Sequence, residues 1–303
     1  MGNVLTITNI SKKYDKKLVL DKVNMSIDRG DIYGFVGENG SGKTTIIRLI
    51  TGLIFPNEGD IELFGINSKS SEVLNVRKKV GAIVETPSIY KNMSAKDNLT
   101  TQASLFNITD LSKVDNVLDI VGLGYLINDK KQAGNFSLGM RQRLGIAMAL
   151  ISDPEFIILD EPMNGLDPQG IVEVRELIVK LNQEHNITFL ISSHILTELS
   201  LIATKYGIIS KGKMIKEITN EELKNECRDY MFIKSEDNDK LEEVLLKSVE
   251  EENIQKMGNG CRVYGNVSLN ELFKSFNKHK LTINSINTIE TNIEDYYLRL
   301  VRE

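Results

Sequence analysis

The sequence has few cysteines, no long apolar run and no excess of positive charge, and each absence argues against a class of protein. The two cysteines, Cys227 and Cys261, match no metal-binding spacing, so we interpret both as reduced thiols without a functional role. No stretch approaches the roughly 20 consecutive apolar residues that a membrane-spanning helix needs. The net charge of −5 gives no electrostatic reason to expect nucleic acid as a partner.

The location of the protein is predicted from similar absences. The first residues, MGNVLTITNISKKYD, lack the apolar core of a signal peptide, and their alternation favours a strand. We therefore expect a cytoplasmic protein without direct membrane insertion. If it works at a membrane, a partner must bring it there.

Charge and patterning divide the chain into two predicted domains. All of the net negative charge lies from Glu221 onward, whereas the preceding residues carry equal numbers of basic and acidic side chains. This change in composition predicts a boundary near residue 220. We assign residues 1–219 to the first domain, with a helical subdomain at about 88–150, and residues 220–303 to the second. Strands and helices alternate in the second domain, which is typical of a small α+β domain whose role the sequence leaves open.

Strands that alternate with helices in the first domain predict an α/β fold with a mostly parallel sheet. Short apolar runs such as Phe156–Leu159 and Phe189–Ile191 are typical of parallel strands that are buried on both faces. The segment Thr44–Ile54 has the apolar spacing of a helix. Residues 206–218 have the pattern of a closing hairpin.

Residues Gly37–Thr44, GENGSGKT, fit the pattern G-x-x-x-x-G-K-[ST] between a predicted strand and a predicted helix. This context is typical of a phosphate-binding loop, where backbone N–H groups converge on phosphate oxygens at the positive end of a helix dipole. Lys43 is expected to reach the β- and γ-phosphates, Thr44 to ligate Mg²⁺ and Thr45 to contact the α-phosphate. The predicted nucleotide contacts are Gly37, Asn39, Gly40, Ser41, Gly42, Lys43, Thr44 and Thr45.

Two carboxylates follow the apolar run Phe156–Leu159. Asp160 is predicted to hold Mg²⁺ through water, and Glu161 to polarise an attacking water molecule as a general base. Two adjacent acids after a strand can also be a solvated strand end. Beside a phosphate-binding loop the catalytic interpretation is favoured, so the sequence predicts nucleotide binding with Mg²⁺ and hydrolysis.

The segment NFSLGMRQRLGIAMAL resembles the signature of one family, the ATP-binding subunits of ABC transporters. That signature is usually LSGGQ, and here it reads FSLGM over Phe136–Met140, with departures at the first, third and fifth positions. Ser137 and Gly139 match the family, and the resemblance implies that they contact the γ-phosphate held by the opposite subunit. They lie at a predicted helix start, which suits an anion.

Further positions match motifs of the same family, and the resemblance covers about residues 4–219. It implies that Tyr14 stacks on adenine and that Asp167, in NGLD, lies in the loop that crosses the dimer interface. It also implies that His194, which follows a buried strand, senses the γ-phosphate.

The resemblance implies an overall architecture. The expected fold is a P-loop NTPase of the ABC ATPase type, with a RecA-like, mostly parallel core sheet, an antiparallel β subdomain and a helical signature subdomain. One phosphate loop and one signature per chain imply that ATP is held between two chains, most simply two copies of this one. Hydrolysis would drive a separately encoded membrane permease, which would hold the subunit at the inner face of the cell membrane.

Glu85, in the segment VETPS, stands where the family normally has glutamine. Together with SLGM and NGLDPQGIVEVR, this glutamate resembles one branch, the ATPases of bacitracin-resistance and lantibiotic self-protection exporters. A carboxylate is a stronger Mg²⁺ ligand than an amide oxygen, so we expect Glu85 to take part in metal binding and catalysis. The alternative is that Glu85 replaces glutamine without consequence.

The predicted function is that of the ATPase subunit of an exporter for peptide antibiotics. One alternative is an exporter of another cargo, such as a drug, sodium or a polysaccharide. Another is a soluble ATPase that acts on ribosomes or DNA. The second alternative is disfavoured, because the sequence has one ATPase domain, no long coiled-coil insertion and no basic face.

Overall fold

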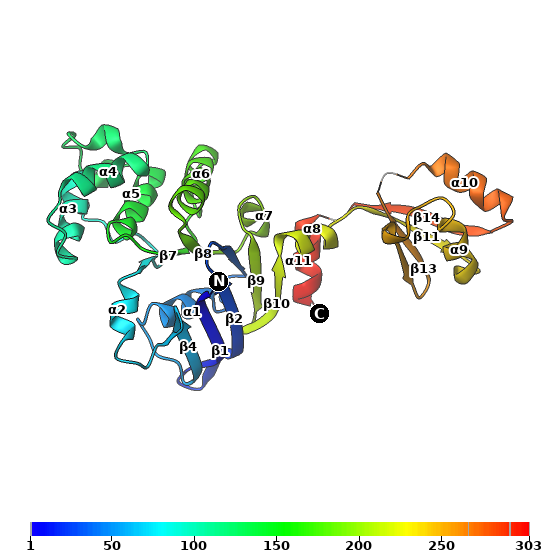
Figure 1. The fold of residues 1–303 in the computed structure, drawn as a ribbon, viewed down its shortest axis with the longest axis horizontal. Helices are drawn as coiled ribbons and strands as arrows, with labels where there is room; N and C mark the ends of the chain where they lie inside the picture. Colours follow the sequence, from blue (N-terminus) through cyan, green and yellow to red (C-terminus); the bar gives the residue numbers. More distant parts are fainter. Residues whose placement is uncertain (1, 266, 291, 303) are drawn as a thin grey trace. The chain divides into compact units, whose positions relative to one another are not determined.

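The computed structural model describes residues 2–265, 267–290 and 292–302 of the chain. The chain divides into two units, residues 1–220 (unit 1) and residues 221–303 (unit 2), which are described separately (Figure 1). The division lies one residue from the boundary that we predicted at 219/220. Within the described ranges, no helix is long and apolar enough to cross a membrane.

A six-stranded sheet forms the centre of unit 1. Its strands are β3 (Ile32–Val36), β6 (Val80–Ile83), β7 (Phe156–Asp160), β8 (Thr188–Ser193), β9 (Lys205–Ser210) and β10 (Lys213–Thr219). They lie in the order β10-β9-β3-β8-β7-β6, and all neighbours are parallel except β9 and the edge strand β10. β3 and β7 are buried at every position, which matches their apolar sequences.

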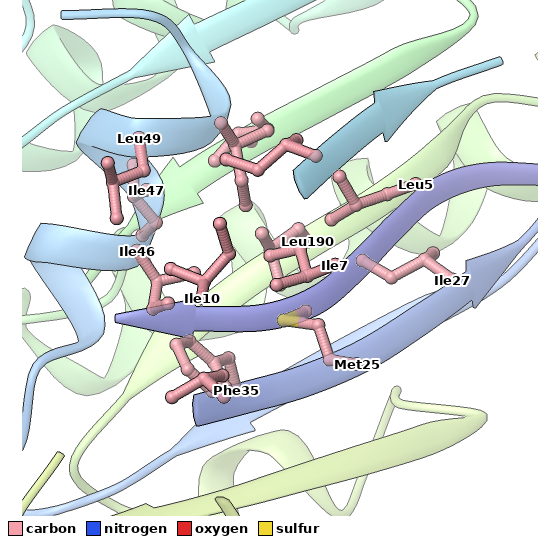
Figure 2. Packing of buried hydrophobic residues seen from close by; sticks show 14 of the residues in the cluster. Leu5, Ile7, Ile10, Met25, Ile27, Phe35, Ile46, Ile47, Leu49 and Leu190 are labelled. Atoms are coloured by element: carbon pink, nitrogen blue, oxygen red, sulfur yellow. The ribbon is translucent and has the colours of Figure 1, made fainter. Parts of the chain in front are cut away.

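A second sheet of unit 1 is antiparallel and has the strand order β2-β1-β4-β5. Its strands are β1 (Asn3–Tyr14), β2 (Lys17–Asp28), β4 (Glu58–Leu63) and β5 (Ile66–Asn67). The helix α1 (Lys43–Ile50), which follows the phosphate loop, shares one core with both sheets. Figure 2 shows this core at Leu5, Ile7, Ile10, Met25, Ile27, Phe35, Ile46, Ile47, Leu49 and Leu190. The phosphate loop is therefore anchored on one side by β3 and on the other by a buried helix.

Three helices form the helical part of unit 1 and contact one another (Figure 1). They are α3 (Ala95–Leu105), α4 (Ser112–Ile120) and α5 (Leu138–Leu150). Ser94 begins α3 with a capping box that includes Asp97, and Ser137 caps α5 by accepting a hydrogen bond from the N–H of Met140 at 3.2 Å. The signature sequence thus begins a capped helix. The other helices of unit 1 are α2 (Val73–Arg77), α6 (Pro168–His185) and α7 (Leu196–Leu199), with 3₁₀ turns η1 (Gly124–Leu126) and η2 (Ala133–Asn135).

Close packing joins α5 to the edge of the core sheet at two glycines. A Cβ atom on Gly145 of α5 would lie 2.6 Å from Cβ of Pro87, in the segment after β6. A Cβ atom on Gly81 of β6 would lie 2.7 Å from the carbonyl oxygen of Ala149. The helix that carries the signature is therefore packed directly against the segment that contains Glu85.

Unit 2 contains an antiparallel sheet in the order β12-β13-β11-β14. Its elements follow one another as β11 (Tyr230–Ser235), α9 (Asn238–Leu245), β12 (Ile254–Met257), β13 (Gly260–Tyr264), α10 (Leu269–Lys278) and β14 (Ile283–Ile289). This β-α-β-β-α-β order is that of the ferredoxin-like folds. The helix α8 (Asn220–Glu226) begins at the last residue of unit 1 and continues into unit 2, which also has η3 (Glu251–Asn253) and α11 (Ile293–Arg302). The sequence predictions missed β12 and α8, because both are short and only partly apolar.

The strand that leads into the phosphate loop carries a buried tyrosine with an acidic partner. Tyr33 on β3 is fully buried, and its hydroxyl donates a 2.7 Å hydrogen bond to Oε1 of Glu217 on β10. Burial, followed by the nearby Glu217 carboxylate, raises the pKa of Tyr33 well above its ordinary value of 10.0. Above pH 10 the unfolded chain therefore loses this proton while the folded chain keeps it, so the stabilisation by the neutral phenol falls as the pH rises.

We predict that Tyr33→Phe lowers the free energy of unfolding by about 1 kcal/mol at pH 7, because one hydrogen bond to a carboxylate is lost. Above pH 10 the difference between wild type and variant should shrink by up to about 1.4 kcal/mol per pH unit. Urea unfolding at a series of pH values measures both. A difference that stays constant up to pH 11 would contradict the assignment of a raised pKa to Tyr33.

Candidate functional site

The phosphate loop connects β3 to α1 and has a backbone conformation that glycine adopts readily. Gly40 and Gly42 have φ angles of +81° and +112°, in the left-handed region. No side chain caps α1, and its first turn has no acidic residue. The first N–H groups of α1 are therefore available to an anion, which the helix dipole also favours.

Lys43 and Ser41 line the same loop. The Lys43 side chain is buried, and its Nζ donates a 2.6 Å hydrogen bond to the carbonyl oxygen of Gly37 and lies 3.2 Å from Oε1 of Glu161. The hydroxyl of Ser41 is buried and has no hydrogen-bond partner among the described residues. A buried hydroxyl without a partner costs free energy, which would be recovered if the hydroxyl donated a hydrogen bond to a phosphate oxygen.

A chain of hydrogen bonds links α1 to the ends of β7 and β8. Thr44 Oγ1 donates to Oδ2 of Asp160 at 3.0 Å, and Ser192 Oγ donates to Oδ1 at 2.6 Å. Ser192 Oγ also accepts a hydrogen bond from the N–H of Glu161 at 2.9 Å. The parallel register of β7 and β8 pairs Asp160 with Ser192, which brings these groups together. Two hydroxyls therefore hold the buried Asp160 carboxylate in place.

Glu161, the first residue after β7, lies between two basic side chains. Its Oε2 is 2.6 Å from Nδ1 of His194, and its Oε1 is 3.2 Å from Nζ of Lys43. The backbone of Glu161 has φ = +51°, a region that residues other than glycine rarely occupy. Such strain persists only where the surroundings hold it, and it is enriched at functional sites. The carboxylate is therefore oriented by an unusual turn and by two partners.

Glu85 lies in the segment after β6 and also has a left-handed backbone, with φ = +63°. Its carboxylate forms an ion pair with the guanidinium of Arg48 on α1, and the two side chains are 59% and 39% exposed. The described partner of Glu85 is thus a cation on the phosphate-loop helix. Its role in metal binding and catalysis remains a prediction.

The signature residues and Asp167 form a second group, at the starts of two neighbouring helices. Ser137 caps α5 and Gly139 lies in its first turn, while Asp167 caps α6 by accepting a 3.2 Å hydrogen bond from the N–H of Gly170. A Cβ atom on Gly139 would lie 3.7 Å from Cα of Gly170, so the two helix starts are adjacent. In the part of the chain that the structure describes, no hydrogen bond or ion pair joins this group to the phosphate loop.

The remaining predicted contacts lie at the rim of the loop or at the end of a strand. Tyr14, the last residue of β1, is 41% exposed, and Nζ of Lys12 lies 5.2 Å from the centroid of its ring. Asn39 is exposed on the loop, and Thr45 is half-buried in the first turn of α1.

Two residues of this region were missed by the sequence predictions. Ser192 lies on β8 two residues before His194, and its signal was a polar residue at the end of an otherwise apolar strand. Arg48 lies four residues after Thr44, and this spacing puts both on one side of α1. Neither sequence pattern identifies its residue as part of the site unless the neighbouring strands are known.

The parallel sheet, the glycine loop and the acidic residues at the ends of neighbouring strands define the class of P-loop NTPases. The model of the ABC transporter family matches residues 20–164. The bacitracin transport ATP-binding protein BcrA of Bacillus licheniformis is 41% identical over 99% of this chain and 98% of its own length. The lantibiotic transport ATP-binding protein SrtF of Streptococcus pyogenes is 43% identical over 71% of this chain and 90% of its own.

A solved structure shows the same fold. The ADP conformation of MJ1267, an ATP-binding cassette of an ABC transporter, superposes with a TM-score of 0.65 and is 27% identical, covering 74% of this chain and 94% of its own. The chain therefore belongs to the ABC transporter family as an ATP-binding protein. The resemblance and fold class predicted from the sequence are confirmed, and the chain is an ATPase whose hydrolysis is coupled to transport.

We predict that Ser192→Ala lowers the ATPase rate about tenfold and the free energy of unfolding by about 2 kcal/mol. The substitution leaves the buried Asp160 oxygen and the N–H of Glu161 without their shared partner. Steady-state ATPase assays and urea unfolding measure the two effects. Ser210→Ala, which removes a buried hydroxyl from β9, is the matched control and should keep the wild-type rate. A wild-type rate in Ser192→Ala would show that this serine does not support the two acids.

Proposed function

We propose that this chain is the ATP-hydrolysing subunit of an exporter that protects a cell against peptide antibiotics, most specifically of the bacitracin type. The proposed position of the ATP site rests mainly on one observation, that Glu161 lies between Lys43 and His194. The choice of cargo is supported by the 41% identity to a bacitracin transport protein, which covers both units of the chain. The 43% identity to a lantibiotic transport protein, over 71% of the chain, supports the wider class.

The triphosphate of ATP is proposed to lie along the phosphate loop. Lys43 would exchange the carbonyl oxygen of Gly37 for β- and γ-phosphate oxygens, and Thr45 would contact the α-phosphate. The unpartnered hydroxyl of Ser41 supports this placement, because it needs an acceptor. At the other end of the nucleotide, the exposed ring of Tyr14 would stack on adenine.

Thr44 and Asp160 fit the ligand preferences of Mg²⁺, because they bring a hydroxyl and a carboxylate oxygen within 3.0 Å of each other. Glu85 is the proposed third protein group. Bound Mg²⁺ would neutralise charge on the β- and γ-phosphates. Among the described residues there is no group of three or more His, Cys, Asp or Glu that could hold a metal, and a Mg²⁺ site completed by phosphates and water does not need one.

Glu161 is proposed to accept a proton from the attacking water, and His194 to sense the γ-phosphate. The carboxylate is already oriented by Nδ1 of His194, so a shift of His194 toward the phosphate would move Glu161 as well. The second group, Ser137, Gly139 and Asp167, is proposed to close the site of another copy in a two-fold dimer. No hydrogen bond or ion pair between described residues joins this group to the phosphate loop of its own chain, which supports this arrangement.

A separately encoded permease is proposed to dock beside Glu85 and to hold the subunit at the inner face of the cell membrane. A groove of about 580 Å³ lies between β6, α3 and α5. Its lining includes the exposed apolar side chains of Leu53, Tyr90, Leu105 and Phe106. Exposed apolar side chains gathered in a groove are typical of an interaction site.

We predict that Glu161→Gln keeps ATP binding within about threefold of wild type and lowers turnover at least a hundredfold, because the amide cannot accept the proton. Binding of labelled ATP and release of phosphate measure the two properties. The matched control is Glu155→Gln, which removes a carboxylate directly before β7, at the opposite end of the strand from Glu161 and outside the site. Near-normal turnover in Glu161→Gln would dismiss Glu161 as the base.

The cargo is tested in cells that produce the chain with its permease. Wild-type chain should raise the bacitracin concentration needed to stop growth, and Glu161→Gln should not. Protection against a drug, sodium or a polysaccharide precursor, without protection against bacitracin or a lantibiotic, would favour the exporter of another cargo. ATPase activity with no permease in a membrane pull-down would favour a soluble ATPase.

A further inference from the structure

The ion pair between Arg48 and Glu85 compensates the negative charge that a glutamate adds at this position. An additional carboxylate close to a triphosphate repels it, unless a cation compensates the charge. Arg48 supplies that cation, because its guanidinium is paired with the Glu85 carboxylate. The pair rests on the proposed ATP site, since the repulsion exists only if a triphosphate occupies the loop.

The position of Arg48 on α1 connects the pair to the phosphate loop. Arg48 lies four residues after Thr44, so the two side chains emerge from the same side of the helix, one turn apart. Thr44 in turn donates a hydrogen bond to Asp160. Arg48 also lies in the last turn of α1, where the helix dipole favours a positive charge. The ion pair therefore ties the Glu85 carboxylate to the same helix that carries Thr44.

The segment that carries Glu85 is held at two points. Its carboxylate is fixed to α1 by Arg48, and Pro87 packs against Gly145 of α5. The backbone of Glu85 is in the left-handed region, which a residue with a side chain adopts at some cost. An exposed ion pair alone stabilises a fold by only about 0–1 kcal/mol, so stability is a weak reason for this arrangement.

We propose that Arg48 is a positioning residue for Glu85: it neutralises the carboxylate and holds it against the phosphate-loop helix, which makes a glutamate at this position compatible with ATP. Without Arg48 the carboxylate is uncompensated and weakens triphosphate binding. With glutamine at position 85 there is no charge to compensate, and Arg48 becomes dispensable for binding.

A double-mutant cycle tests this proposal with ATP binding as the readout. The proteins are wild type, Arg48→Met, Glu85→Gln and the double variant, and the probe is a non-hydrolysable ATP analogue with Mg²⁺ in a calorimeter. Arg48→Met should weaken binding about three- to tenfold in the wild-type background, and by less than about twofold in the Glu85→Gln background. The loss should shrink in about 0.5 M salt, because screening weakens a charge effect at an exposed position.

Two controls separate charge from structure. Arg48→Lys keeps the charge and should bind within about twofold of wild type. Arg175→Met removes the same charge from another helix, α6, and should leave the affinity unchanged. Thermal unfolding of each variant checks that the fold is intact.

Three outcomes of the double-mutant cycle would contradict the proposal or its premise. If Arg48→Met costs the same affinity in the wild-type and the Glu85→Gln backgrounds, Arg48 acts on ATP directly and the proposal is wrong. If Arg48→Met binds like wild type, the pair is only a surface contact and the proposal is also wrong. If wild type itself does not bind the analogue, the proposed ATP site fails first, which the cycle reveals before any coupling is calculated.

Discussion

The parallel pairing of β3, β7 and β8 brings the ends of these strands to one edge of the core sheet, and the phosphate site depends on this edge. β3 leads into the phosphate loop, β7 ends at Asp160, and β8 ends one residue before His194. The register between β7 and β8 pairs Asp160 with Ser192, so a single serine hydroxyl supports both acids. The burial of α1 in the core then fixes Thr44 and Lys43 against that edge.

Two of the carboxylates near the phosphate loop are paired with basic side chains. Glu161 has Lys43 and His194 as partners, and Glu85 has Arg48. Glu161 follows β7 and Glu85 follows β6, and both residues have a left-handed backbone. The turn after each strand orients the carboxylate, and a cation then holds it. Pairing with a cation reduces the repulsion that each of these two carboxylates would exert on a bound triphosphate.

Sequence reasoning is strongest where a motif and its flanking elements are contiguous. The phosphate loop, the strand before Asp160 and the hairpin of β9 and β10 all follow from local patterns, and the fold class is confirmed. The Ser192–Asp160 hydrogen bond and the Arg48–Glu85 pair join residues 32 and 37 positions apart, so no local pattern contains them. The short strand β12 was missed for another reason, because its four residues are stabilised by pairing with β13 and not by their own propensity.

Within the ranges that the structure describes, no hydrogen bond or ion pair joins Ser137, Gly139 or Asp167 to the phosphate loop. This supports the central proposal, that ATP is held between two copies of this chain. Its most direct test is to produce a Lys43→Ala copy together with a Ser137→Arg copy and to measure ATPase activity in the purified mixed pairs. Each variant alone should be inactive, because every site in its dimer lacks one essential group. A mixed pair contains one site with both Lys43 and Ser137 intact, so the account predicts that part of the wild-type rate returns. Mixed pairs that form but remain as inactive as either variant alone would contradict it.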